Sequence, residues 1–86
     1  MEEKIIDCSK IYIKEDLHRI FRETLSFPDW YGNNLDALYD CLTDISGTVR
    51  LLNWEIAESN LGSYGQKAKK VIATAALHNV GLDLYL

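Results

Sequence analysis

The spacing of apolar residues in the first half of the chain predicts one strand and two helices. The β-branched run Lys4–Asp7 is typical of a strand. A helix is predicted over Asp16–Leu25. Its apolar residues fall at i, i+3, i+4 and i+8: Leu17, Ile20, Phe21 and Leu25. Pro28 stops this helix, because proline disfavours helical geometry in itself and in the preceding residue. A second helix is predicted over Leu35–Ile45, with Asn34 as its N-cap.

The second half of the chain predicts two further strands and two further helices. The expected elements, in order, are a strand at Thr48–Trp54, a short helix at Trp54–Asn60 capped by Asn53, a loop at Leu61–Gln66, a helix at Lys67–Val80 and a strand at Leu82–Leu86. Strands separated by helices favour parallel pairing through crossovers. We therefore expect a single α/β domain over residues 1–86, with a three-stranded parallel sheet and about four helices.

Charge is distributed unevenly along the chain. The net charge is −4 over 86 residues. Between Glu23 and Val49 there is no Lys or Arg, and the charged residues are all acids: Glu23, Asp29, Asp36, Asp40 and Asp44. The remaining residues carry eight acids and nine bases, so this segment accounts for the negative balance. Such a segment disfavours direct binding of nucleic acid and favours a basic protein partner.

Cysteine content and hydropathy predict a cytoplasmic protein with no membrane contact. Cys8 and Cys41 are the only cysteines, which is too few for a disulfide framework. The first ten residues are charged and contain no apolar run of signal-peptide length. No run of 18 apolar residues occurs. We expect reduced thiols, and a monomer when the protein is free.

The predicted helix at Leu35–Ile45 has an acidic face. Asp36, Asp40 and Asp44 are spaced four apart, so they stack along one side of the helix, opposite its apolar residues. Aromatic residues, which are enriched at protein interfaces, lie close in sequence: Trp30, Tyr31 and Tyr39. The pattern favours a docking surface for a basic partner, and a plain solvated helix face is the alternative.

Catalytic and metal-binding interpretations receive little support from the sequence. Three aspartates on one helix face diverge instead of encircling an ion, so no metal or other cofactor is expected. A hydrolase would pair the aspartates with His18 or His78, but neither histidine lies in a nucleophile motif. Nearby carboxylates disfavour a thiolate at Cys41, so packing is its expected role. The lysines at 67, 69 and 70 form a basic patch that is expected to be solvated.

Residues 28–43 resemble a motif of the barstar family, the intracellular inhibitors of barnase-type ribonucleases. The segment reads Pro-Asp-Trp-Tyr-Gly-Asn-Asn-Leu-Asp-Ala-Leu-Tyr-Asp-Cys-Leu-Thr, a long and ungapped match. The resemblance continues through Asp16-Leu17-His18, through Leu51–Glu55 and at Gly81. It implies the barstar-like fold, with a parallel three-stranded sheet, and it implies that Gly32–Thr43 contacts the enzyme.

By this resemblance, the protein is a non-catalytic inhibitor of a basic, barnase-like ribonuclease. Asp36 and Asp40 would enter the active site in place of RNA phosphates, while Trp30 and Tyr39 pack on the enzyme. The residues expected at the partner are Trp30, Tyr31, Gly32, Asn34, Leu35, Asp36, Tyr39, Asp40, Thr43 and Asp44. A barstar-like interaction module with a non-nuclease partner is the alternative.

The chain departs from the barstar pattern at several positions of the implied contact surface. Asn33 and Ala76 stand where the pattern has acids, and Asp44 stands where it has glycine. Trp30 and Tyr39 exchange one aromatic residue for another. The acidic surface is therefore narrower than the pattern implies.

Overall fold

The fold is a parallel sheet whose strands are connected by helices. The structure is a computed structural model, and it describes residues 3–86. The elements are β1 (Glu3–Asp7), a 3-10 turn η1 (Cys8–Lys10), α1 (Lys14–Leu25), α2 (Leu35–Asp44), β2 (Gly47–Leu52), α3 (Trp54–Leu61), α4 (Ser63–His78) and β3 (Leu82–Tyr85). The strand order is β1-β2-β3, and both pairs are parallel. This confirms the predicted α/β fold.

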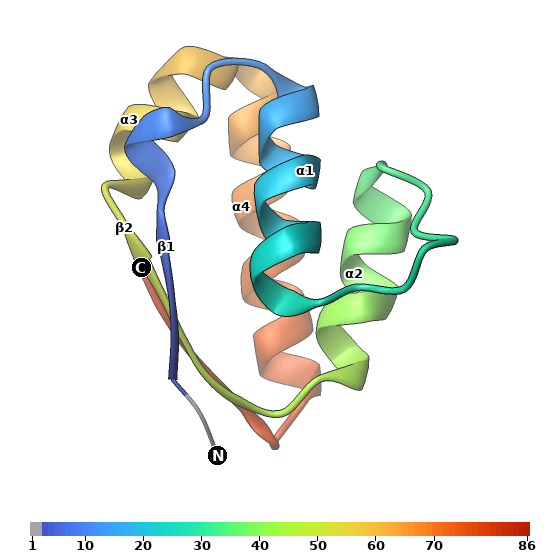
Figure 1. The fold of residues 1–86 in the computed structure, drawn as a ribbon. Coiled ribbons are helices and arrows are strands. Elements are labelled where there is room, and N and C mark those ends of the chain that lie inside the picture. The colour runs from blue at the N-terminus through green and yellow to red at the C-terminus, as the bar shows by residue number, and fades with distance from the viewer. Residues whose placement is uncertain (1–2) are drawn as a thin grey trace.

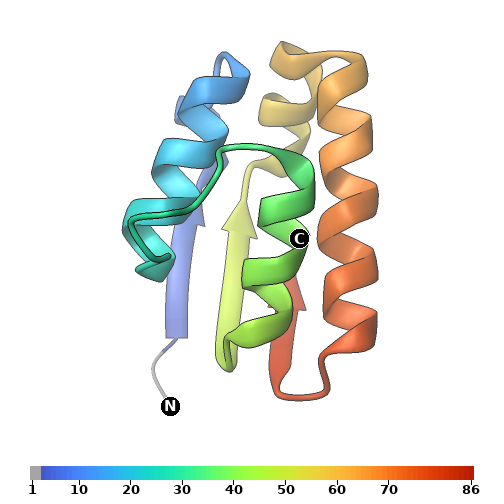
Figure 2. The same cartoon turned by 90° about the vertical axis from the view of Figure 1, so that its right-hand side faces the viewer.

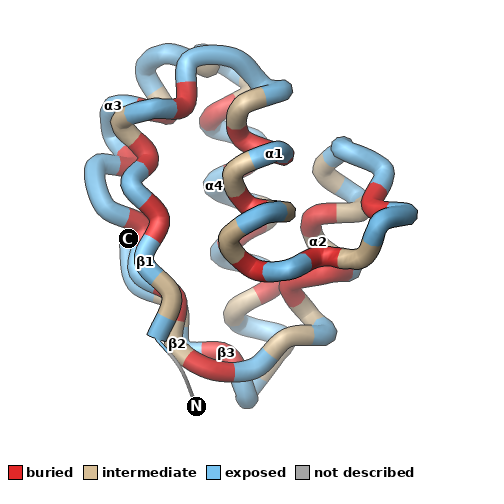
Figure 3. Tube along the Cα trace, in the orientation of Figure 1, coloured by how far each residue is buried: buried red, intermediate tan, exposed pale blue. Residues whose placement is uncertain are grey.

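Three helices cover one face of the sheet. Figures 1 and 2 show α1, α2 and α4 side by side on that face. Successive strand residues point to opposite faces, so alternate positions differ in burial (Figure 3). The side chains beneath the helices are buried: Ile6, Val49, Leu51 and Leu82. On the open face, Arg50 pairs with Glu3, and its guanidinium lies 4.9 Å from the centre of the Tyr85 ring.

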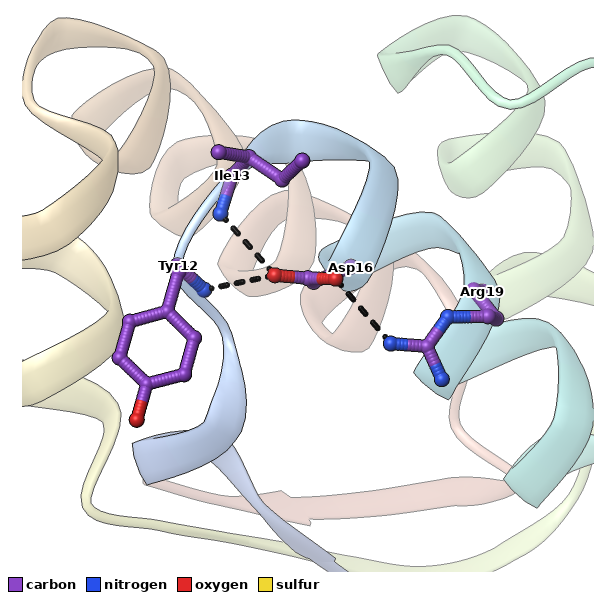
Figure 4. Close-up of polar contacts among 4 residues, drawn as sticks. All are labelled: Tyr12, Ile13, Asp16 and Arg19. Carbon is purple, nitrogen blue, oxygen red and sulfur yellow. Dashed lines mark hydrogen bonds and ion pairs between the residues drawn. The ribbon is translucent and has the colours of Figure 1, made fainter.

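Helix α1 begins at Lys14, two residues before the predicted start. Asp16 explains this start, because its carboxylate Oδ2 accepts hydrogen bonds from the backbone N–H groups of Tyr12 (3.0 Å) and Ile13 (3.2 Å) (Figure 4). These bonds satisfy the backbone N–H groups of the N-cap residue Ile13 and of the residue before it, and they lower the pKa of Asp16. The helix ends at Leu25, and its C-cap residue Ser26 adopts the left-handed conformation (φ 56°).

Helix α2 is capped as predicted. The side-chain oxygen of Asn34 accepts a hydrogen bond from the backbone N–H of Ala37 at 2.8 Å. The apolar face is packed against the rest of the core, since Leu38 and Leu42 are fully buried. Cys41 is also buried, in keeping with the packing role expected from the sequence. The helix therefore holds its outward face in a fixed position.

The loop predicted at Leu61–Gln66 is wrong, because helix α4 already begins at Ser63. A single residue, Gly62 with φ 62°, separates α3 from α4. Gly65 is there for close packing instead of a turn: a Cβ atom at this position would lie 2.8 Å from Cα and from the carbonyl oxygen of Glu58. Small size, not backbone flexibility, is the property that this glycine supplies.

Two further boundaries differ from the sequence prediction. Strand β2 ends at Leu52, because Asn53 takes the left-handed conformation (φ 59°) and Trp54 begins α3. Asn53 forms no side-chain cap and donates from its amide to the Asp7 carboxylate at 3.2 Å. At the other end of the chain, α4 stops at His78 instead of Val80.

Candidate partner-binding surface

Asp36, Asp40 and Asp44 lie exposed along α2. Within residues 3–86, no ion pair joins any of them to a Lys, Arg or His side chain. Asp36 is in the first turn, where the helix dipole favours a negative charge, and the last turn has no basic residue to balance Asp44. Stacked like charges destabilise a helix by a few tenths of a kcal/mol per pair. The face is therefore open to a cationic partner.

The acidic face borders a groove between α2 and α4, with a volume of about 480 Å³. Residues of both helices line it: Leu35, Asp36, Tyr39, Asp40, Lys70, Val71 and Thr74. Sequence reasoning identified the α2 residues but missed those of α4. Lys70, Val71 and Thr74 recur at helical spacing, yet nothing local shows that this face of α4 meets α2.

A hydrogen bond between side chains closes one end of the α2–α4 contact. The Tyr39 hydroxyl lies 2.7 Å from Nδ1 of His78, and the two rings meet edge to face. Below it, the side-chain amide of Asn79 donates to the carbonyl oxygens of Leu42 (2.9 Å) and Ile45 (2.7 Å). These bonds fix the C-terminal half of α2 relative to α4.

The loop before α2 presents one aromatic side chain and buries another. Trp30 is 74% exposed, which makes it a large apolar surface next to the acidic helix. Tyr31, expected at the partner surface, is only 4% exposed. Its ring packs against Phe27, and it therefore supports the loop from beneath. Gly32 and Asn34 are exposed between Trp30 and the helix.

Tyr31 is anchored by a buried histidine. His18 is 1% exposed, with Nδ1 at 2.6 Å from the Tyr31 hydroxyl and Nε2 at 2.6 Å from the Tyr64 hydroxyl. Burial lowers the pKa of His18 and raises the pKa of Tyr31. A neutral imidazole donates from one nitrogen and accepts at the other, so both nitrogens are satisfied. His18 is thus a buried core residue whose two ring nitrogens are both hydrogen-bonded.

The remaining expected contact residues lie on the same surface. Leu35 and Tyr39 are half-buried in the groove, and Thr43 donates from its hydroxyl to the Asp40 carbonyl oxygen at 2.8 Å. Six of the ten expected residues thus lie along one side of α2, and Trp30, Gly32 and Asn34 are exposed in the loop that precedes it. Tyr31 is the one that is buried.

The two cysteine thiols are both free and buried. Burial, and then Asp44 and Asp40, raise the pKa of Cys41, and burial raises the pKa of Cys8 to about 12, so both stay thiols. In the described part of the chain, no group of three or more His, Cys, Asp or Glu side chains could hold a metal ion. Nor is any helix of residues 3–86 long and apolar enough to cross a membrane.

The fold and this surface define a small α/β domain of the barstar-like class. Comparison with known proteins agrees: residues 1–80 match the family model described as Barstar (barnase inhibitor). The chain belongs to the barstar family. A relative from Bacillus subtilis (strain 168), named "Putative ribonuclease inhibitor YrdF", is 44% identical over 78 residues, which are 87% of this chain and 86% of the relative. The family is one of ribonuclease inhibitors, so a ribonuclease is the class of partner that it implies.

Proposed function

We propose that this protein inhibits a basic, barnase-like ribonuclease by filling its active site with the acidic face of α2. One observation carries the proposal: Asp36 and Asp40 are exposed and unpaired on a capped helix whose opposite face is buried. A ribonuclease active site needs cationic side chains to hold RNA phosphates. Two carboxylates one helical turn apart offer the same charge to those cations.

Rigidity makes this mimicry effective. The Asn34 cap, the buried Leu38 and Leu42, and the Tyr39–His78 hydrogen bond hold α2 before any partner arrives. Little conformational entropy is then lost when the carboxylates meet the enzyme. The protein needs no catalytic group for this role, and it acts by excluding substrate.

The rest of the surface supplies apolar contact around the charges. Trp30 can cover the rim of the active site, since it is exposed in the loop two residues before Gly32, where the acidic surface begins. The α2–α4 groove can receive a side chain from the enzyme between Tyr39 and Val71. Asp44 extends the negative charge by one further turn.

The test is an RNA-cleavage assay with a microbial guanyl-specific ribonuclease. Stoichiometric protein should suppress cleavage, and Asp40→Ala should weaken binding by at least about 30-fold, because truncating one member of a buried charge pair costs about 2–5 kcal/mol. Asp83→Ala is the matched control, since Asp83 is an exposed aspartate on β3 and is not one of the residues of the proposed partner-binding surface. Inhibition that survives Asp40→Ala, or is lost equally with Asp83→Ala, contradicts the proposed surface.

Absence of binding to any ribonuclease would instead favour the interaction module with a non-nuclease partner. Affinity capture with the wild-type protein and with Asp40→Ala in parallel identifies that partner. A protein captured only by the wild type uses the acidic face of α2.

A further inference from the structure

A second, oppositely charged cleft lies beside the same loop. It has a volume of about 410 Å³ and is lined by Lys14, Glu15, His18, Arg19, Arg22 and Asn33. Five of these residues belong to α1, and Asn33 belongs to the loop that leads into α2. Figure 2 shows this loop turning back along α1 on its way to α2. We call this site the basic cleft.

The cations of the basic cleft come from one side of α1. Lys14, His18 and Arg22 are spaced four apart, so they follow one another along a single helix face, with Arg19 next to them. The lining holds three cationic side chains and one carboxylate, that of Glu15. His18, at the base of the cleft, is buried and adds no positive charge, because burial lowers its pKa.

Within residues 3–86, two of the cations form no ion pair. No ion pair in residues 3–86 joins Lys14 or Arg22 to an acid. The Lys14 ammonium lies 5.9 Å from the centre of the ring of Tyr64, which is not one of the residues that line the cleft. Arg19 is held by Asp16 at 3.1 Å (Figure 4), so its guanidinium is already oriented.

We propose that the basic cleft receives acidic side chains of the ribonuclease whose active site is occupied by α2. The inference rests on the proposed function and adds a requirement on the partner: carboxylates must lie beside its cationic active site. Asn33 lines the cleft from the loop that also carries Trp30 and Gly32. A protein that covers Trp30 and Asp36 therefore brings its own surface over the cleft.

The acidic face of α2 and the basic cleft together fix the orientation of the complex. A partner rotated by half a turn on this surface would place its cations against Lys14 and Arg22, and its carboxylates against Asp36 and Asp40. Such like-charge contacts penalise the wrong orientation and speed the correct encounter. The basic cleft is thus a specificity element, and its effect should appear mainly in the rate of association.

The test compares two charge reversals with the same change in net charge. Lys14→Glu with Arg22→Glu reverses the basic cleft, whereas Lys10→Glu with Lys69→Glu reverses exposed lysines on η1 and α4. Association with a guanyl-specific ribonuclease is measured by stopped flow at low salt and at high salt. The cleft variant should associate at least about tenfold more slowly at low salt, with the difference shrinking at high salt. The control should associate as fast as wild type or faster, because it is more acidic overall.

Three outcomes overturn the inference. Equal rates for the cleft variant and the control show that only net charge matters. An unchanged rate for the cleft variant, together with weaker binding by Asp40→Ala, removes the basic cleft and leaves the proposed function intact. A cleft variant that loses affinity for a single-stranded RNA oligonucleotide, with unchanged ribonuclease association, assigns the cleft to nucleic acid.

The neutral double variant Lys14→Gln with Arg22→Gln is a second test in case the charge-reversed variant does not fold. It should show an intermediate loss of association rate with unaltered circular dichroism. Carbodiimide cross-linking of the wild-type complex should in addition join the Lys14 amine to a carboxylate of the ribonuclease, detectable as a linked peptide by mass spectrometry. A fully folded neutral variant with wild-type rates contradicts the proposal.

Discussion

His18 joins three segments that are far apart in the sequence. It sits on α1, and its ring nitrogens contact hydroxyls from the loop before α2 and from α4, at Tyr31 and Tyr64. Tyr31 stands between Trp30 and Gly32 in this loop. A single buried imidazole therefore sets the position of the loop that carries the exposed aromatic residue.

The burial of His18 predicts a pH dependence of stability. Its pKa is lowered from an ordinary value of 6.5, so the unfolded chain binds this proton more readily than the folded one. Stability should therefore be highest above about pH 7 and should fall as the pH drops through 6.5. Urea unfolding between pH 8 and pH 5 measures this slope. It should be absent in His18→Gln and retained in His78→Gln, and a slope that persists in His18→Gln contradicts the assignment.

At the scale of the element, the N-terminus of α2 depends on one side chain. Asn34→Ala removes the acceptor of the Ala37 N–H and should lower the free energy of unfolding by about 1 kcal/mol. Asn34→Ser keeps a cap and should recover most of the loss. Urea denaturation of the three proteins checks this, and equal stability of the Ala and Ser variants would show that the cap contributes nothing.

The contact between α3 and α4 depends on Gly65. Helix propensity alone predicts that Gly65→Ala stabilises α4 by about 1 kcal/mol. The added Cβ would instead lie 2.8 Å from the Glu58 backbone, and overpacking of this kind costs about 1–3 kcal/mol. We expect a lower urea midpoint for Gly65→Ala. Gly81→Ala is the control, because its Cβ would meet nothing closer than 3.4 Å; a rise for Gly65→Ala contradicts the packing account.

The sequence predicted elements well where the signal is local. The Asn34 cap and the apolar spacing of α1 and α2 involve residues within a few positions of one another, so those helices were found with small errors at their ends. Gly65 was misread as part of a loop because its partner, the Glu58 backbone, is supplied by helix packing. Asn53 was likewise expected to cap α3, but it bonds to Asp7 on a neighbouring strand.

In the candidate site, too, the sequence predicted the features that depend on local spacing and missed those that depend on contacts between distant segments. The acids of α2 were visible as an i, i+4 pattern, and their exposure follows from the apolar face opposite them. The burial of Tyr31 was not visible, because it depends on His18 and Phe27 from other segments. The basic cleft was hidden for the same reason: its cations precede the acidic segment in the chain and meet the loop only through the fold.

For the whole molecule, folding converts an uneven charge sequence into two charged surfaces that share one loop. The acidic surface on α2 carries Asp36, Asp40 and Asp44, and the basic cleft on α1 carries Lys14, Arg19 and Arg22. The net charge of −4 hides this separation. A partner is therefore selected by where its charges lie as well as by their sum.

Competition with a small active-site ligand tests the central claim most directly. Association of the protein with a guanyl-specific ribonuclease is followed by stopped flow while a guanosine monophosphate occupies a rising fraction of the enzyme. If α2 fills the phosphate site, the observed rate should fall in proportion to the occupied fraction, and the dissociation rate should stay constant. An association rate that is independent of the nucleotide, with both ligands bound in one ternary complex, would contradict active-site blockade.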